Sequence, residues 1–275
     1  MATQKINLSA GVRSNLLTLQ NTTKLIATVQ TRLSTGLKVN SAIDDANAYF
    51  TAKALNNRSD DLNALKSNID LSISAIQSAI HGIESITELV QQAKGLVNTA
   101  KATGDTSERS LLAIQFNALL VQIDNLANDS NFNGTNLIRS TPDNLQVDFN
   151  EDSTSSITIT GLDSTTASTG LDITEAGNNF ANLTDINFSI TQLNSALTEL
   201  RTNAATLGSN NTVLQTRLDF TANLSTTLQE GAGKLTLADL EESANLLALQ
   251  TRQQLGLNSL SLAARSERAV LALFG

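Results

Sequence analysis

The spacing of apolar residues organises the chain around one long stretch, residues 62–100. At alternating steps of three and four residues, eleven of twelve positions there are apolar. The twelve positions are Leu62, Leu65, Ile69, Ser72, Ile76, Ala79, Ile83, Ile86, Val90, Ala93, Val97 and Ala100. This repeat puts one stripe along a helix that another helix must bury. At about 1.5 Å per residue the rod is about 60 Å long, so its partners must be long helices as well.

Similar periodicity predicts those partners on both sides of the rod. Residues 186–228 continue the three-four alternation and end at the glycines of 231–233, and a last helix follows from about Leu237. Residues 3–37 form the first helix, closed by a glycine at 36. A shorter helix begins after Gly104 and should fold back antiparallel on the rod.

The region 142–184 changes character and predicts the only β structure. Apolar residues alternate at 145–149 and at 157–159 across a polar linker, which is typical of a hairpin. Leu171–Thr174 is a possible short strand, and the Asn133–Gly134 pair predicts a tight turn. The predicted fold is therefore mainly α, with long antiparallel coiled-coil rods from both chain ends and a small central β-hairpin region.

Both terminal helices carry an apolar stripe that a single pairing would cover only partly. We therefore expect an incomplete monomer that self-associates, because head-to-tail contacts that do not close form open filaments. The residues expected to carry this self-assembly are Leu8, Val12, Leu16, Leu19, Ile26, Leu33, Leu246, Leu249, Leu257, Leu260, Leu271 and Phe274.

Composition and charge support a rod and argue against other classes. Aromatic residues make up 3% of the chain, with one proline and no cysteine, so disulfides and thiol chemistry are excluded. The net charge of −8 combines +5 over residues 1–43, −13 over 44–230 and zero over 231–275. The acidic middle argues against nucleic-acid binding. The basic arm is too dispersed to favour an anion or membrane site, and neither an 18-residue apolar run nor a secretory signal peptide occurs.

No pattern in the chain indicates catalysis or a cofactor. His81 is the only histidine and has no metal-ligand spacing around it, so we expect a plain helix-surface role. Adjacent carboxylates at 44–45 and 60–61 point about 100° apart on a helix and suit capping better than acid/base chemistry. Phosphate-binding glycine loops, His-Glu-x-x-His and dinucleotide fingerprints are absent, so no catalytic, metal or cofactor-binding residue is expected.

Three segments resemble bacterial flagellin. Residues 32–46, with Leu33, Ser34, Gly36, Asn40, Ser41, Ala42, Asp44 and Asp45, are similar to the family's N-terminal motif. Phe132, Asn133 and Gly134 resemble its Phe-Asn-Gly segment, and residues 238–255 with 270–274 resemble its C-terminus. The order of the three matches is also that of the family. Since only about 45 residues separate Ile138 from Ile186, the resemblance is to a short form without the outer variable domains.

The resemblance implies a structural, non-enzymatic subunit that assembles through its terminal helices into the flagellar filament used for swimming. It implies an inner filament domain of residues 1–45 plus 232–275 and a rod domain of 46–231 that includes the hairpin. It also implies an extracellular location, flagellum-specific type III export, and as partners other copies of the chain, a secretion chaperone, and the cap and hook-junction proteins. Nucleic acid and membrane insertion are not expected.

Alternatives from other classes remain open at this stage. A hook-filament junction protein would share the terminal helices but would be expected to have a longer central region. A self-contained coiled-coil scaffold, or a membrane-surface binder, would form a stable monomer or small oligomer and bind liposomes at low salt. A hydrolytic enzyme is the most distant of these alternatives.

Overall fold

The computed structural model describes residues 10–274, and the chain divides into two compact units. One unit is Met1–Arg58 with Thr227–Gly275, and the other is Ser59–Thr226. The elements in chain order are α1 (Ala10–Thr35), α2 (Ala46–Ala102), α3 (Thr106–Asp129), β1 (Leu145–Asp148), β2 (Ser156–Ile159), η1 (Gly177–Phe180), α4 (Leu183–Thr236) and α5 (Leu240–Phe274). The expected mainly α fold with long helices and a small β-hairpin is confirmed.

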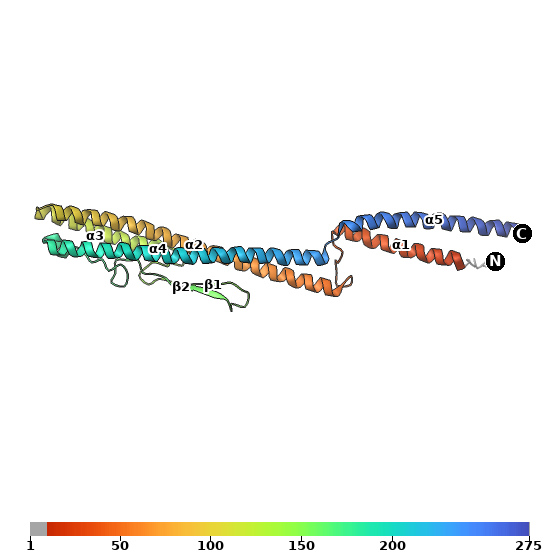
Figure 1. Ribbon diagram of the computed structural model, residues 1–275, viewed down its shortest axis with the longest axis horizontal. Helices are drawn as coiled ribbons and strands as arrows, with labels where there is room; N and C mark the ends of the chain where they lie inside the picture. Colours follow the sequence, from red (N-terminus) through yellow and green to blue (C-terminus); the bar gives the residue numbers. More distant parts are fainter. Residues whose placement is uncertain (1–9, 275) are drawn as a thin grey trace. The chain divides into compact units, whose positions relative to one another are not determined.

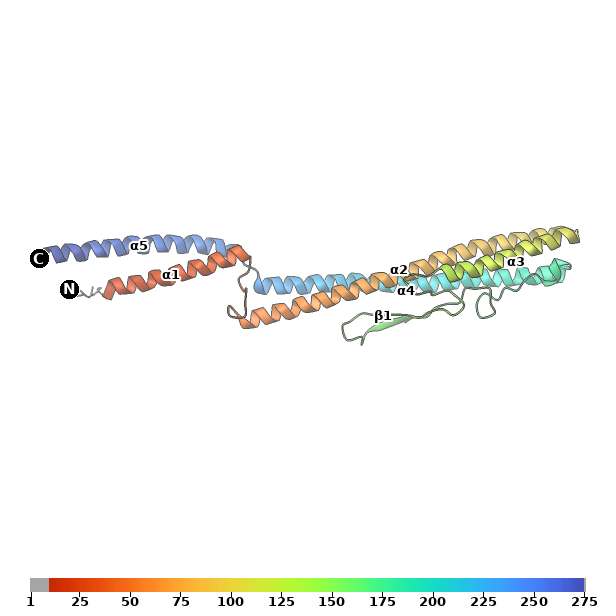
Figure 2. The same cartoon turned by 180° about the vertical axis from the view of Figure 1, so that it is seen from behind.

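In the first unit, the two terminal helices α1 and α5 lie side by side (Figure 1, Figure 2). Where α1 ends and α5 begins, two segments of the chain pair in antiparallel orientation. We call these segments, residues 36–45 and 236–239, the elbow. Leu37 pairs with Leu237, the Lys38 amide donates to the Thr236 carbonyl at 2.8 Å, and the Ala238 amide donates to the Gly36 carbonyl at 2.9 Å. Gly36 has φ +70°, which favours glycine and ends α1 as the sequence predicted.

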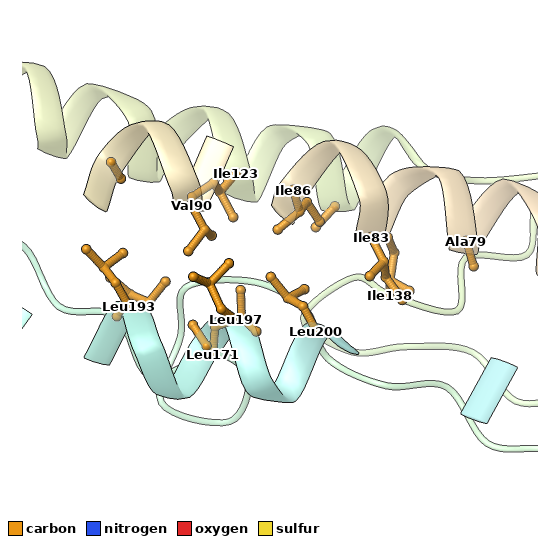
Figure 3. Close-up of a cluster of buried hydrophobic side chains, with 14 of the residues drawn as sticks. Ala79, Ile83, Ile86, Val90, Ile123, Ile138, Leu171, Leu193, Leu197 and Leu200 are labelled. Carbon is orange, nitrogen blue, oxygen red and sulfur yellow. The ribbon is translucent and has the colours of Figure 1, made fainter. Parts of the chain in front are cut away.

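The second unit has one continuous core in which α2 and α4 face each other. Figure 3 shows Ile83, Ile86 and Val90 of α2 pointing toward Leu193, Leu197 and Leu200 of α4. Ile123 of α3, with Ile138 and Leu171 from the segments between helices, completes this part of the cluster. Of the twelve predicted seam positions on α2, all are buried except Leu65, which is half-buried.

The α2–α4 seam is polar at one end of the unit. The buried hydroxyls of Ser59 and Ser225 are 2.8 Å apart, and Ser225 also donates to Asn63 Oδ1 at 3.2 Å. These small side chains satisfy each other without a large apolar core. The main apolar cluster lies beyond this stretch, along residues 69–214.

Helix α3 starts where its sequence predicts, just after Gly104. Asp105 is the N-cap and accepts from the Ser107 amide at 2.8 Å, and Glu108 lies in the first turn. Its buried face consists of Ala113, Phe116, Leu120, Ile123 and Ala127. Among the described residues, α3 is the one helix whose length and composition would also suit a membrane span, and only 28% of its most apolar window is buried.

The predicted hairpin forms, but its strands are short. β1 and β2 pair antiparallel with Leu145 opposite Ile159 and Val147 opposite Ile157, and Val147 and Ile159 are buried in the core. Just beyond β1, the Arg217 guanidinium of α4 lies 4.8 Å from the centre of the Phe149 ring. Apolar burial and this cation–π contact together hold the hairpin against the helices.

Two predicted details are wrong. Leu171–Thr174 is not a strand: Leu171 and Ile173 are buried as single anchors of a loop, whose backbone bonds to Thr165 and Thr166 instead of a sheet. The glycines at 231 and 233 do not end α4, which continues to Thr236. Ala232 between them is buried, so packing offsets the cost of about 1 kcal/mol per helical glycine.

A left-handed turn precedes α4. Asn178, Asn179 and Phe180 all have positive φ, of 45°, 51° and 60°. Asparagine tolerates this region, but phenylalanine rarely adopts it. Phe180 is fully buried with its ring 5.4 Å from that of Phe116, so core packing holds the strained residue in place.

Gly82 allows the chain after α3 to approach α2 closely, which generates a stability prediction. A Cβ at Gly82 would collide with Ser130 Oγ and lie 2.7 Å from Ile138 Cδ1, whereas a Cβ at Gly95 meets nothing within 4 Å. We expect Gly82→Ala to lower the free energy of unfolding by about 1–3 kcal/mol. Gly95→Ala, the matched control in the same helix, should raise it by up to about 1 kcal/mol.

Urea unfolding followed by circular dichroism measures both variants. Equal stabilisation by the two substitutions would show that Gly82 is not a packing constraint.

Candidate functional site

The paired terminal helices bury one seam between them. Ile26, Val29 and Leu249 are buried and Leu246 packs against them. Farther along, a Cβ at Gly256 would lie 3.4 Å from Leu19, and Gln253 donates to Thr23 Oγ1 at 3.2 Å. Of the predicted assembly residues, those that are buried or half-buried are Val12, Leu16, Leu19, Ile26, Leu246, Leu249 and Leu260.

The other predicted assembly residues have different positions. Leu33 and Leu257 are exposed, by 36% and 47%. Leu8 lies outside the described residues, and so do the side chains of Leu271 and Phe274. The pairing of α1 with α5 therefore accounts for most of the stripe that the sequence indicated, and leaves two of its leucines in solvent.

A second row of leucines on the same helices remains exposed, and we call it the outer leucine face. Its members are Leu17 and Leu25 on α1, and Leu247, Leu255 and Leu262 on α5, each more than half exposed. At about 100° per residue, Leu17, Leu247, Leu255 and Leu262 lie on the sides of α1 and α5 that are turned away from the buried seam, and Leu25 lies at the edge of the seam, beside Val29. A helix that is apolar on opposite sides is typical of one buried all round.

Sequence reasoning missed the outer leucine face because it sought a single stripe on each helix. The available signal was the number of leucines that fall outside the three-four repeat. On α5, the neighbours Leu246 and Leu247 cannot share one face, so the second of them already indicates another apolar side.

α3 presents a comparable uncovered surface in the other unit. Leu111, Ile114 and Val121 are each more than half exposed on the side opposite its buried face. This explains why so little of an apolar helix is buried within the chain.

The N-terminal motif forms the elbow, where polar contacts fix the chain. The Asp44 carboxylate accepts from the amides of Asn40 and Ser41 at 3.1 and 2.9 Å and from the Ser41 hydroxyl at 3.1 Å. These bonds, chiefly those from Ser41, hold the pKa of Asp44 below its usual value of 3.8, with a small contribution from Arg32. Asp45 accepts from the Ala48 amide at 2.9 Å and starts α2.

An ion pair links this motif to the C-terminal segment. Arg32 Nη1 lies 2.8 Å from Glu242 Oε1, with side chains 35% and 15% exposed. The other carboxylate oxygen, Glu242 Oε2, is buried and has no hydrogen-bond partner. Arg32 is therefore the group that neutralises a largely desolvated carboxylate.

The Phe132–Gly134 motif belongs to the other unit and forms a turn there. Asn133 and Gly134 have φ of 49° and 85°, and Phe132 and Thr135 exchange two backbone bonds of 2.9 and 3.0 Å. The predicted tight turn is confirmed. Next to it, the buried Asn136 donates to the carbonyls of Ala127 and Asn128 and accepts from the Ile138 and Arg139 amides, a role that the sequence did not indicate.

Outside the elbow, the titratable side chains that the structure describes do not assemble into a reaction centre. His81 is exposed and its Nδ1 lies 3.3 Å from Glu84, one turn along α2. Burial, followed by repulsion from Asp163 and Asp172, raises the pKa of Glu199. Within residues 10–274, no group of three or more His, Cys, Asp or Glu side chains is arranged to hold a metal ion.

Comparisons with known proteins find sequence relatives that match the whole chain. Residues 6–142 match the family described as the bacterial flagellin N-terminal helical region. Flagellin FljO of Caulobacter vibrioides is 33% identical over 276 residues, which cover all of both chains. A flagellin of Brucella melitensis is 28% identical over 268 residues, 94% of this chain and 95% of that one. The crystal structure of Bacillus cereus flagellin aligns with 56% of this chain and 88% of its own, at 21% identity and TM-score 0.49.

The Arg32–Glu242 pair generates a prediction about the elbow. Arg32→Gln leaves the Glu242 carboxylate buried without its cation, so we expect a local loss of about 1–2 kcal/mol. That loss should speed hydrogen exchange of the Lys38 and Ala238 amides about 5- to 30-fold. Glu242→Gln in the same chain should restore most of the protection. Unchanged exchange in Arg32→Gln would mean that the ion pair does not stabilise the elbow.

Asp44 generates a pH prediction. Because its folded pKa is lowered, its contribution to stability is complete above about pH 3.8 and is lost as the pH falls through the lower, folded value. A carboxyl-carbon NMR titration should give a midpoint below 3.8 for Asp44. The Ser41→Ala variant, which removes one of the three bonds, should move that midpoint upward, and a wild-type midpoint at or above 3.8 would contradict the capping role.

Proposed function

This chain belongs to the bacterial flagellin family, and on that premise we propose that the outer leucine face of α1 and α5 is the surface through which its copies assemble. Flagellins are structural proteins rather than enzymes, and the chain is a subunit of the extracellular flagellar filament. The observation that supports the proposed surface is the second row of exposed leucines on helices already paired through another face.

Burial of this face supplies a reasonable driving force. Five leucines that are each more than half exposed would contribute about 1 kcal/mol apiece, or about 5 kcal/mol gross per copy. Ordering of the terminal helices offsets part of that gain. Weak single contacts of this size favour growth at an existing end, where one incoming copy is covered by several neighbours at once.

The two helices present different surfaces, which favours an open polymer. A two-fold dimer would need the same patch to complement itself, whereas distinct patches on α1 and α5 suit head-to-tail contacts that repeat without closing. The exposed leucines of α3 give the other unit a surface that further copies would also cover.

Within this proposal, residues 1–45 plus 232–275 act as the inner filament domain, and 46–231 as the rod domain with the hairpin. The compact unit that contains both terminal helices supports the grouping of the two chain ends, although this unit is larger and comprises Met1–Arg58 with Thr227–Gly275. Family membership also leads us to propose flagellum-specific type III export, a secretion chaperone for the terminal helices, and contacts with the cap and hook-junction proteins.

Seeded elongation tests the assembly surface. Leu262→Asp places a charge on the outer leucine face, where the native side chain is 71% exposed, so α1 and α5 should still pair but elongation should fall at least tenfold. Leu260→Asp places a charge in the half-buried seam between α1 and α5, so this variant should lose both the pairing of the two helices and elongation. Leu16→Asp, on the α1 side, should behave like Leu260→Asp. Ser261→Asp, the matched control, adds the same charge to the same turn without removing an apolar contact.

Filament length by negative-stain electron microscopy and helicity by circular dichroism separate these outcomes. Normal elongation of the Leu262→Asp chain would contradict the proposed assembly surface. A wild-type chain that does not elongate seeds but binds filament ends would favour a junction protein instead.

A further inference from the structure

We propose that the exposed side of α3 in one copy of the chain packs along a groove on α4 of a neighbouring copy. The inference rests on the proposed function, because it takes the partner to be another copy in the filament. It adds to that function a specific contact made by the Ser59–Thr226 unit, which is separate from the pairing of the terminal helices.

α3 carries a second apolar stripe on the side opposite its buried face, and we call it the outer stripe. Its residues follow one another at steps of three, four and three, which is the spacing of a coiled-coil seam. They are Leu111, Ile114, Ala118 and Val121, and all four are exposed. No Asp, Glu, Lys or Arg occurs between Arg109 and Asp124, so no charge interrupts the stripe. A helix with this pattern is normally covered by another helix.

α4 is hollowed along the side turned away from its seam with α2, and we call this surface the threonine groove. Two adjoining hollows of about 700 and 590 Å³ share Thr198 and Thr202. At about 100° per residue, these threonines lie opposite the buried leucines of α4. The exposed residues of the groove are small and also recur at steps of four and three: Thr191, Ser195, Thr198, Thr202, Ala205 and Ser209.

The threonines of the groove can be covered without leaving a hydroxyl donor unpaired. The Thr198 hydroxyl donates to the Asn194 carbonyl at 3.0 Å, and the Thr202 hydroxyl to the Thr198 carbonyl at 3.1 Å. The Thr206 hydroxyl donates to the Thr202 carbonyl at 2.9 Å. Burial of a polar group is costly chiefly when its hydrogen bond is lost. Because these bonds lie within α4 itself, an apolar partner that excludes water does not break them.

The outer stripe and the threonine groove complement each other in size and spacing. Large side chains on one helix pack best against small ones on the other. Both surfaces repeat every 3.5 residues, so a contact made at one turn recurs at the next. At about 1.5 Å per residue, the stripe is about 15 Å long and the groove about 30 Å, so the whole stripe fits. Glu199 and Arg201, which border the groove, have opposite charges that do not repel a neutral stripe.

Pairing of the outer stripe with a second outer stripe is the main alternative. A two-fold contact of that kind closes into a dimer, whereas contacts between different patches repeat without closing. Each copy supplies one outer stripe and one threonine groove, so the contact between α3 and α4 is of the repeating kind. A filament subunit therefore favours the groove as the partner of the stripe.

Single cysteines test this contact directly, because the chain has no native cysteine. One partner chain carries Ile114→Cys, and a second version carries Ala118→Cys, so that a loss of packing at one position cannot hide the contact. Each is mixed with a chain that carries one substitution in the groove: Thr198→Cys, Thr202→Cys or Thr206→Cys. The mixtures are copolymerised on filament seeds, treated with a short bis-maleimide linker and resolved by denaturing electrophoresis.

Thr216→Cys is the matched control for the groove substitutions. Thr216 is also exposed on α4, and its hydroxyl donates to the Thr212 carbonyl at 3.0 Å, but it lies beyond the groove. We expect covalent dimers from at least one mixture of a stripe chain with a groove chain, at least fivefold above the yield with Thr216→Cys. Each chain alone should give no more dimer than the control mixture.

Two results would overturn the inference while leaving the proposed function intact. One is normal elongation of the mixtures with no more dimer from any groove position than from Thr216→Cys. The other is abundant dimer from Ile114→Cys or Ala118→Cys alone, since that indicates a two-fold contact between α3 helices. Failure of the wild-type chain to elongate seeds would overturn the proposed function itself, and this inference with it.

Discussion

Lateral burial is the constraint on which this protein depends, because a long helix in water is stabilised mainly by what packs along its side. α2 and α4 meet that need within the chain: their seam is closed by Ile, Val, Leu and Ala side chains that are almost entirely buried. α1 and α5 meet it only on one side. The need for lateral burial is thus met within the Ser59–Thr226 unit, whereas the terminal helices keep an exposed apolar surface.

The α1–α5 pair differs from the core of the second unit in the side chains that it buries and exposes. The second unit places its large side chains, such as Phe116 and Phe180, inside and fixes its loops through satisfied polar groups such as Asn136. The terminal pair instead has a buried seam on one side of its helices and exposed leucines elsewhere on them. Its polar contacts are concentrated at the elbow, where Asp44 and the Arg32–Glu242 pair fix the geometry from which both helices leave.

Periodicity predicted the buried seam of α2 almost residue by residue, because a 3.5-residue repeat has one geometric solution. Local chemistry also predicted the turn at Asn133–Gly134 and the start of a helix after Gly104. The local prediction was wrong where contacts between residues far apart in the sequence determine the structure. α4 continues through Gly231 and Gly233, and Leu171 and Ile173 anchor a loop rather than a strand. The outer leucine face was missed for a related reason, since only the pairing of α1 with α5 reveals which leucines remain uncovered.

The elbow also determines the order in which the chain can fold. Arg32 and Glu242 are 210 positions apart, so closing their contact directly from a random chain carries a large loop-closure entropy. The segment between them contains the whole Ser59–Thr226 unit, whose α2–α3 contacts are local in sequence and form on a faster timescale. Once that unit has folded, the remaining loop is short and the terminal helices can meet. We therefore expect the proposed assembly surface to be the last part of the chain to form, which would limit premature association of the newly made protein.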